Sequence, residues 1–391
     1  MCKHCGYSFK EEAQVKNIQF RDAMKNSVVR LIVILRFHLG VSVRGISEVI
    51  SGVFGIYASL GFIDSVCQKV SAVAAVKMDM INQCGQNKAQ VFMLDETFPK
   101  AKDTGCINLG VATCENGLIR KVGVIDTTKK STSLDNFLKS VITGNYKPEI
   151  FMSDYDLSYP SAIKRLIPDI TIIKDFVHTV RQINKDRKSA INKIAVEFSS
   201  SMKITKEKRK KIIDLKKALM RKQLNRILHK MLKGFKAKNC AVGTLYIEGG
   251  LTELKEFTKK FRSLEPFYNK LNKFVKKYIE TWNIHMELYS KGKAPLTSNI
   301  IESKNSIFKA FSKKSKSYNS KQLENFFCGV ALYENFDIKT RGINKGTNAM
   351  MRAGIDLSEF GANNFFDAIG IPQTIKSKDL SKLITNVQTY I

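Results

Sequence analysis

Between residues 89 and 176 short apolar runs alternate with turn residues, and this pattern constrains the fold more than any other feature of the chain. Five runs have the length and apolar content of buried strands: AQVFMLDETF (89–98), INLGVATCENG (107–117), LIRKVGVIDT (118–127), EIFMSDYD (149–156) and DITIIKDF (169–176). Two further segments have helical spacing and predict helices over 133–144 and 159–167.

The order of these elements predicts how the strands pair. Asn116-Gly117 lies between the second and third strands, and Asn-Gly is a strong signal for a tight hairpin. The last two strands each follow a helix, as in parallel βα units. We therefore expect an α/β fold with a mixed sheet, antiparallel in its first three strands and covered by helices on both faces.

Residues 20–80 have helical periodicity throughout. Segments 27–40, 42–55 and 59–76 each contain apolar residues at helical spacing, and Gly residues separate them. Helix, short turn and helix is the helix-turn-helix pattern, whose second helix can enter the DNA major groove. A plain three-helix bundle gives the same pattern, so both interpretations remain open.

The net charge indicates the class of partner. The chain has 65 Lys and Arg against 35 Asp and Glu, a net charge of +30 and a pI of about 9.7. Such an excess repels itself unless a polyanion relieves it, and nucleic acid is the usual polyanion. A protein that only coats nucleic acid is the alternative, but such proteins seldom have so many ordered apolar segments. Much of the excess lies in the helical segment 181–290, whose basic clusters suggest a surface that faces phosphate.

Three carboxylates stand out by their positions. Asp95 follows the apolar run Val91–Leu94, Asp154 follows Ile150–Ser153, and Glu302 lies in the predicted helix LTSNIIESKNSIFKAF (296–311). A carboxylate at the end of a buried strand is costly unless it is paired or binds a metal. Each Asp alone is well explained as a turn residue. Together they predict a site at one edge of the sheet.

The ligand types indicate which metal this site binds. Carboxylate oxygens with no His or Cys nearby suit Mg²⁺ or Mn²⁺ rather than Zn²⁺. Two such ions activate a water or a 3′-hydroxyl and stabilise the leaving oxygen in phosphoryl transfer. The sequence therefore predicts a metal-dependent site for phosphoryl transfer, formed by Asp95, Asp154 and Glu302.

Three segments together resemble a known family. VFMLDETF, IFMSDYD and TSNIIESKN look like the three catalytic blocks of the DDE transposases of insertion sequences and of the related Mutator-like group. Asp175-Phe-Val-His178 is similar to the D-x-x-H signature of that group, and residues 333–355 resemble its closing stretch.

The resemblance implies an RNase H-like catalytic core, Mg²⁺ dependence and transposition of the chain's own element. It also implies binding to terminal inverted repeats and to target DNA, in a synaptic complex of two or more protomers. The expected organisation is a zinc-ribbon remnant (1–15), a helix-turn-helix region (16–85), a catalytic core (88–180 and 291–345), a basic helical insertion (181–290) and a C-terminal tail (346–391).

The sequence departs from the family's pattern at two places. Cys2-x-x-Cys5 supplies two of the four ligands that structural zinc needs, so it is either half of a ribbon or two free thiols. The second block reads Asp-Tyr-Asp, which makes Asp156 a possible substitute for Asp154. The first departure favours the alternative function, a decayed or domesticated transposase that binds DNA. The three carboxylates favour the enzyme, and a nuclease without a joining step is a third hypothesis.

Several other residues have two interpretations each. His178 either orients substrate or packs beside the sheet, and Trp282, the only Trp, either stacks on a flipped base or lies in a core. Four lysines along or after the Glu302 helix contact phosphate or serve solubility: Lys304, Lys309, Lys313 and Lys314.

The expected location is the cytoplasm, in association with the nucleoid. The longest apolar stretch, 28–43, is interrupted by Arg30 and Arg36 and is shorter than a membrane span, and no secretory signal is found. Eight scattered cysteines form no disulfide framework, which fits a reducing compartment.

Overall fold

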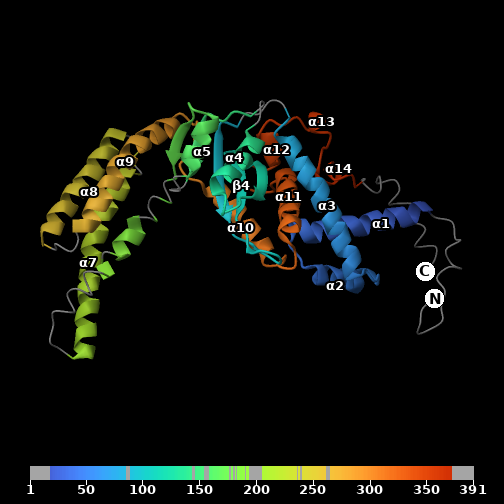
Figure 1. Cartoon of the computed structure of the whole chain (residues 1–391), viewed down its shortest axis with the longest axis horizontal. Coiled ribbons are helices and arrows are strands. Elements are labelled where there is room, and N and C mark those ends of the chain that lie inside the picture. Colours follow the sequence, from blue (N-terminus) through green and yellow to red (C-terminus); the bar gives the residue numbers. More distant parts are fainter. Residues whose placement is uncertain are drawn as a thin grey trace.

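The chain forms an elongated molecule with a β-sheet near its middle and helices at both ends (Figure 1). The computed structural model describes residues 18–84, 89–142, 146–153, 158–175, 178, 181, 183–189, 191–192, 205–235, 237, 240–260 and 265–371. Helices from the N-terminal part of the chain lie at one end, and a bundle of long helices lies at the other.

The central sheet has five strands in the order β5-β4-β1-β6-β7. Their bounds are Val91–Thr97 (β1), Leu109–Cys114 (β4), Ile119–Val124 (β5), Ile150–Ser153 (β6) and Thr171–Lys174 (β7). Strand β4 pairs antiparallel with both β1 and β5, whereas β6 pairs parallel with both β1 and β7. This confirms the predicted mixed sheet, including which strands are antiparallel.

The predicted hairpin is also confirmed. Gly117 has a φ of +83°, a conformation that glycine adopts without strain, and its N–H donates to the carbonyl of Cys114 at 2.9 Å. A two-stranded ribbon of β2 (Lys100–Ala101) and β3 (Gly105–Cys106) was not predicted, because strands of two residues leave no periodicity to detect.

The two faces of the sheet are covered by different helices. Helices α4 (Lys130–Val141) and α5 (Ser158–Leu166) pack on one face, where Phe92 and Leu94 of β1 lie in the core. On the other face Val91 and Met93 pack with Ile301 of α10 (Asn299–Ser312). Side chains of a strand alternate between faces, so Asp95 belongs to the α10 side.

The N-terminal helices share a core with α11 (Ser320–Phe336), which also packs against β5 of the sheet. They are α1 (Ile18–Val33), the π-helical turn η2 (Ile34–His38), α2 (Val43–Phe54) and α3 (Leu60–Ile81). Ser42 and Ser59 cap α2 and α3 by accepting from backbone N–H groups. Because α3 packs along α11, the helices α2 and α3 share one apolar core with the sheet. Their role as a helix-turn-helix stays a prediction.

The C-terminal part joins the same core. Helices α12 (Ala349–Arg352), α13 (Leu357–Phe360) and α14 (Phe365–Ala368) bury Met350, Phe360 and Phe365 against it. Residues 346–371, part of the segment expected to be a tail, are therefore integral to the folded core. Cys2 and Cys5 lie outside the described residues.

Three long helices form a bundle with its own apolar core: α7 (Lys206–Phe235), α8 (Cys240–Lys260) and α9 (Glu265–Ser290). The basic charge is uneven among them: α7 has twelve Lys and Arg against two acids, whereas α8 has three of each and α9 has four bases and three acids. Charge repulsion is therefore concentrated along α7.

Helices α7 and α8 approach closely where two glycines face each other. A Cβ on Gly243 would lie 2.6 Å from the carbonyl oxygen of Gly234 and 2.4 Å from the Trp282 ring. We expect Gly243→Ala to destabilise the bundle by about 1–3 kcal/mol through overpacking, despite alanine's higher helix propensity. Gly249→Ala, in the same helix, is the control, because a Cβ there meets only the flexible end of Lys230. Equal unfolding midpoints for the two variants in urea would contradict this prediction.

None of the helices in the described part of the chain combines the length and the apolar character needed to cross a bilayer.

Candidate functional site

Asp95 and Glu96 point to opposite faces of β1, as alternation requires. On the α10 side, Asn305 Nδ2 donates to Asp95 Oδ2 at 2.5 Å. On the α4 side, Glu96 lies 3.7 Å from Lys130 Nζ. Asp95 is therefore the carboxylate of this pair that reaches the candidate site, and Asn305 fixes its orientation.

Glu302 lies in the first turn of α10, on the same side of the sheet as Asp95. Burial of Ile301 and Phe308 sets the rotation of α10 against the sheet. Glu302 and Asn305 are three residues apart and so share one face of the helix. Glu302 thus lies on the helix that covers the Asp95 side of the sheet, and a shared metal site of the two carboxylates stays a prediction.

Asp154 and Asp156 lie outside the described residues. Strand β6 ends at Ser153, one position before Asp154, and runs parallel to β1 with Met152 opposite Met93. The metal set of Asp95, Asp154 and Glu302 therefore stays a prediction.

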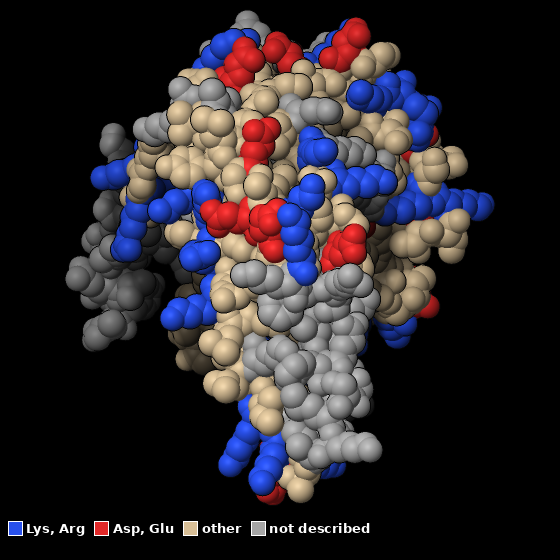
Figure 2. Space-filling model, turned by 90° about the vertical axis from the view of Figure 1, so that its left-hand side faces the viewer, with Lys and Arg blue, Asp and Glu red and all other residues tan. Residues whose placement is uncertain are grey.

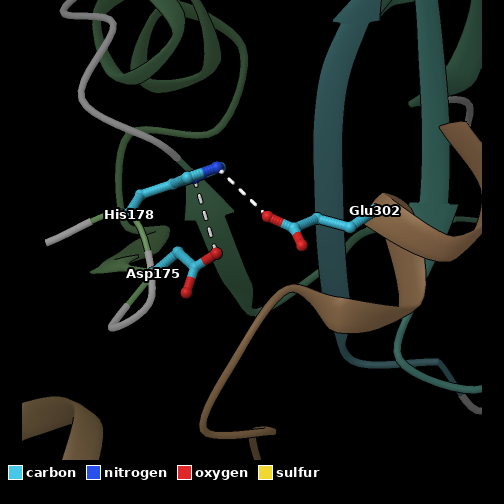
Figure 3. Close-up of side chains that lie close together, drawn as sticks. All are labelled: Asp175, His178 and Glu302. Atoms are coloured by element: carbon cyan, nitrogen blue, oxygen red, sulfur yellow. Dashed lines mark ion pairs between the residues drawn. The ribbon is translucent and has the colours of Figure 1, made fainter. Parts of the chain in front are cut away.

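Glu302 also meets two residues that follow β7 (Figure 3). His178 Nε2 lies 3.3 Å from Glu302 Oε1, and His178 Nδ1 lies 3.5 Å from Asp175 Oδ2. Ligand atoms of Asp175, His178 and Glu302 all lie within 4.8 Å of one another. The imidazole thus lies between two carboxylates, and its functional role stays a prediction.

Asp175 is held from two sides. Its backbone N–H donates to the carbonyl of Ser153 at 3.1 Å, which continues the β6–β7 pairing. Its carboxylate is buried and accepts a hydrogen bond from the hydroxyl of Ser298, the residue just before α10. Asp175 therefore ties the end of β7 to the start of the Glu302 helix.

Arg181 neutralises Glu302. Its Nη1 lies 2.6 Å from Glu302 Oε1 and its Nη2 lies 3.4 Å from Oε2, a two-point contact suited to the planar guanidinium. Arg181 is exposed, so it can leave this position without a large burial cost. No sequence pattern pointed to Arg181, because it is one of 65 basic residues.

The chemistry of this cluster allows two metal sets that share Glu302. The first is the predicted set of Asp95, Asp154 and Glu302. It would supply oxygen ligands alone, which suits Mg²⁺ or Mn²⁺. The set of Asp175, His178 and Glu302 would add an imidazole, which suits a transition metal more than Mg²⁺. Asp175 and His178 fit a second role equally well. In that role they bind no metal but hold Glu302 in position, through Ser298 at the start of α10 and through the imidazole beside the Glu302 carboxylate.

The four lysines predicted as phosphate contacts separate into two groups. Lys304 is 7% exposed and its Nζ lies 3.0 Å from Glu334 of α11, so it joins two helices and is not available to DNA. Lys309, Lys313 and Lys314 are exposed at the end of α10 and remain candidates.

Asn305 should matter through Asp95. Asn305→Ala removes the amide that orients the carboxylate, and loss of such a supporting partner typically costs about 10–100-fold in activity or metal affinity. Strand joining and metal-dependent stabilisation of the protein should fall together, and Asn305→Asp should not restore them because it places a second charge beside Asp95. Unchanged Mg²⁺ half-saturation in Asn305→Ala would contradict this role.

Comparison with known proteins gives little beyond the geometry. No protein-family model and no curated protein sequence matches the chain. Among solved structures the chain is similar to the "Drosophila P element transposase strand transfer complex", with a TM-score of 0.41 and 11% identity. The match covers 83% of this chain and 93% of that one. A likeness this weak carries no argument for function, which therefore depends on the residues themselves.

Proposed function

We propose that the chain is a DNA transposase of the DDE type, with an RNase H-like core that cuts and joins DNA strands using Asp95, Asp154 and Glu302. The observation that carries the proposal is the position of Glu302, on a helix whose next turn binds Asp95 through Asn305. The strand order β5-β4-β1-β6-β7, antiparallel and then parallel, supports the RNase H-like core. The net charge of +30 supports DNA as the substrate.

The donor set fits divalent cations. Asp95 and Glu302 reach the same side of the sheet, and each is held by hydrogen-bond donors: Asn305 for Asp95, and Arg181 for Glu302. Two bound Mg²⁺ or Mn²⁺ ions would activate the attacking hydroxyl and stabilise the leaving oxygen. Carboxylates are needed there because amides cannot offset the charge of two divalent ions beside a phosphate.

The chain's own residues would prepare this site. Asn305 orients Asp95, and Asp175 with Ser298 fixes the start of α10 and hence the position of Glu302. His178 stands between Asp175 and Glu302 and limits the rotation of the Glu302 side chain. Arg181 compensates the charge of Glu302, and once displaced from it the guanidinium is available to a DNA phosphate.

A strand-transfer assay tests the proposal. Full-length protein is incubated with a duplex that ends in the terminus of its own element, with a free 3′-hydroxyl, and with supercoiled plasmid. Joining with Mg²⁺ or Mn²⁺, and none with EDTA, is the expected result. Nicking without joining would indicate a nuclease instead. Tight DNA binding with neither reaction would indicate a DNA-binding protein that has lost catalysis.

A further inference from the structure

A cavity of about 340 Å³ opens between the helical residues 183–189 and 191–192 on one side and α7 on the other, outside the carboxylate site. Its lining is basic and amide-rich, with one apolar residue at the base: Arg187, Lys188, Arg221, Asn192, Asn225 and Ile191. A water molecule takes about 30 Å³ in the liquid, so the cavity has room for a phosphate group with ordered water.

The cavity is built from two helices that present matching faces. Arg221 and Asn225 are four residues apart on α7 and so share a helix face, and Lys188 and Asn192 line the cavity from the facing segment. Arg187 Nη1 donates to Asn225 Oδ1, which aims the guanidinium along the cavity wall. Ile191 belongs to the apolar core of the bundle, so this side of the cavity is held in place by core packing.

The positive charges of this cavity have no acidic counterpart among the described residues that line it. Within the described part of the chain no carboxylate pairs with Arg187 or Arg221, and the nearest acid in sequence, Asp186, pairs with Lys270 at 2.8 Å instead. Burial first, and then the charge of Arg221, lowers the pKa of the Arg187 guanidinium. An anion bound between the two arginines would relieve this repulsion.

The end of the molecule that the helical bundle forms carries charges of both signs. Figure 2 looks onto the end of the molecule that the bundle forms, where Lys and Arg project at several places and Asp and Glu gather near the centre. Binding of a polyanion at this end therefore depends on particular basic sites more than on a general field. Two guanidiniums beside an ammonium are the groups that proteins use to bind phosphate.

We propose that Arg187, Lys188 and Arg221 form a phosphate-binding pocket in the helical insertion. The DNA backbone is the favoured source of the phosphate, because Arg181, six residues before Arg187, contacts Glu302. A separation of six residues would span about 9 Å in helical conformation, which corresponds to two or three nucleotide steps along one strand of a duplex. The pocket would then hold the strand a few nucleotides from the reacting phosphate. The position of the pocket relative to the reacting phosphate rests on the proposed function, whereas phosphate binding by the pocket does not depend on that function.

The test compares two double variants of the full-length protein. Arg187→Gln/Arg221→Gln removes the pocket's guanidiniums, and Lys222→Gln/Arg226→Gln removes two exposed charges of α7 that do not line the cavity. Binding of a fluorescent duplex is measured by anisotropy over a range of NaCl concentrations without divalent cations, so that catalysis plays no part. Circular dichroism melts verify folding, and Arg187→Lys/Arg221→Lys serves if the glutamine pair unfolds.

We expect the pocket pair to bind DNA about 10–100-fold more weakly than the control pair, as removal of charged hydrogen bonds predicts. The slope of log K against log salt should also become shallower by about 0.9 for each phosphate that the variant no longer neutralises. If inorganic phosphate stabilises wild type but not the pocket pair, while DNA binding equals the control, the source is a free phosphate or nucleotide. Equal DNA binding by the two pairs, with no stabilisation by phosphate in wild type, would overturn the proposal.

Discussion

Glu302→Gln should lower the rate of strand joining by more than about 100-fold. Residues that only orient a metal ligand typically cost about 10–100-fold. The amide keeps the shape of the side chain and its place in the first turn of α10, so the fold should change little. It cannot carry the charge that divalent cations require, and its contact with Arg181 becomes much weaker. The rate of joining at saturating Mg²⁺ measures the effect, and Glu287→Gln, an exposed acid of α9, is the control.

Companion variants decide which residues hold the metal with Glu302. If Asp95 and Asp154 bind the metal with Glu302, Asp95→Asn should lower the rate of joining as much as Glu302→Gln does. His178→Gln should then lower this rate by only about 10–100-fold. If Asp175 and His178 bind the metal with Glu302, His178→Gln should lower the rate of joining as much as Glu302→Gln does. The enzyme should then be more active with a transition metal than with Mg²⁺. Full activity in Glu302→Gln would remove both assignments at once.

The strands and the hairpin were predictable because their signals are local. Each of the five strands is a short apolar run, and Asn116-Gly117 specifies its own turn. Asp95 and Glu302 were recognisable because an acid directly after an apolar run, or in a block typical of a family, stands out from its surroundings. The fold class needed no more than the order of these elements.

Helix α11 was not predicted, although it is central to the core. Its residues are apolar on nearly all sides, since it packs against α3, β5 and the C-terminal helices, and a helix buried all round has no polar face to reveal its period. The one local signal was its start, where Asn319 and Gln322 form a capping box. The supporting residues of the site were missed for a related reason. Arg181 and Asn305 are ordinary in type, and only the folded chain brings them to Glu302 and Asp95.

Trp282→Ala should destabilise the insertion by about 3–5 kcal/mol, the usual cost of truncating a large buried aromatic side chain. Trp282 is 1% exposed in the core of the three-helix bundle. Its ring meets Phe235 edge-on at 5.9 Å between centroids, and its Nε1 donates to the Phe235 carbonyl at 3.3 Å. This corrects the interpretation in which Trp282 stacks on a flipped base, because the ring is already enclosed by α7 and α8.

Unfolding in urea, followed by circular dichroism because the variant has no other Trp, measures the loss of stability. Trp282→Phe keeps an aromatic ring against Phe235 and should lose less stability than Trp282→Ala, since less buried volume is removed. The two interpretations of Trp282 separate in Trp282→Leu under conditions where it remains folded. If Trp282 is only a core residue, the folded variant should join strands and bind DNA about as well as wild type. If Trp282 stacks on a base, the variant should lose about 1–3 kcal/mol of DNA-binding free energy with no matching loss of stability. The second pattern would mean that the bundle opens when it meets DNA.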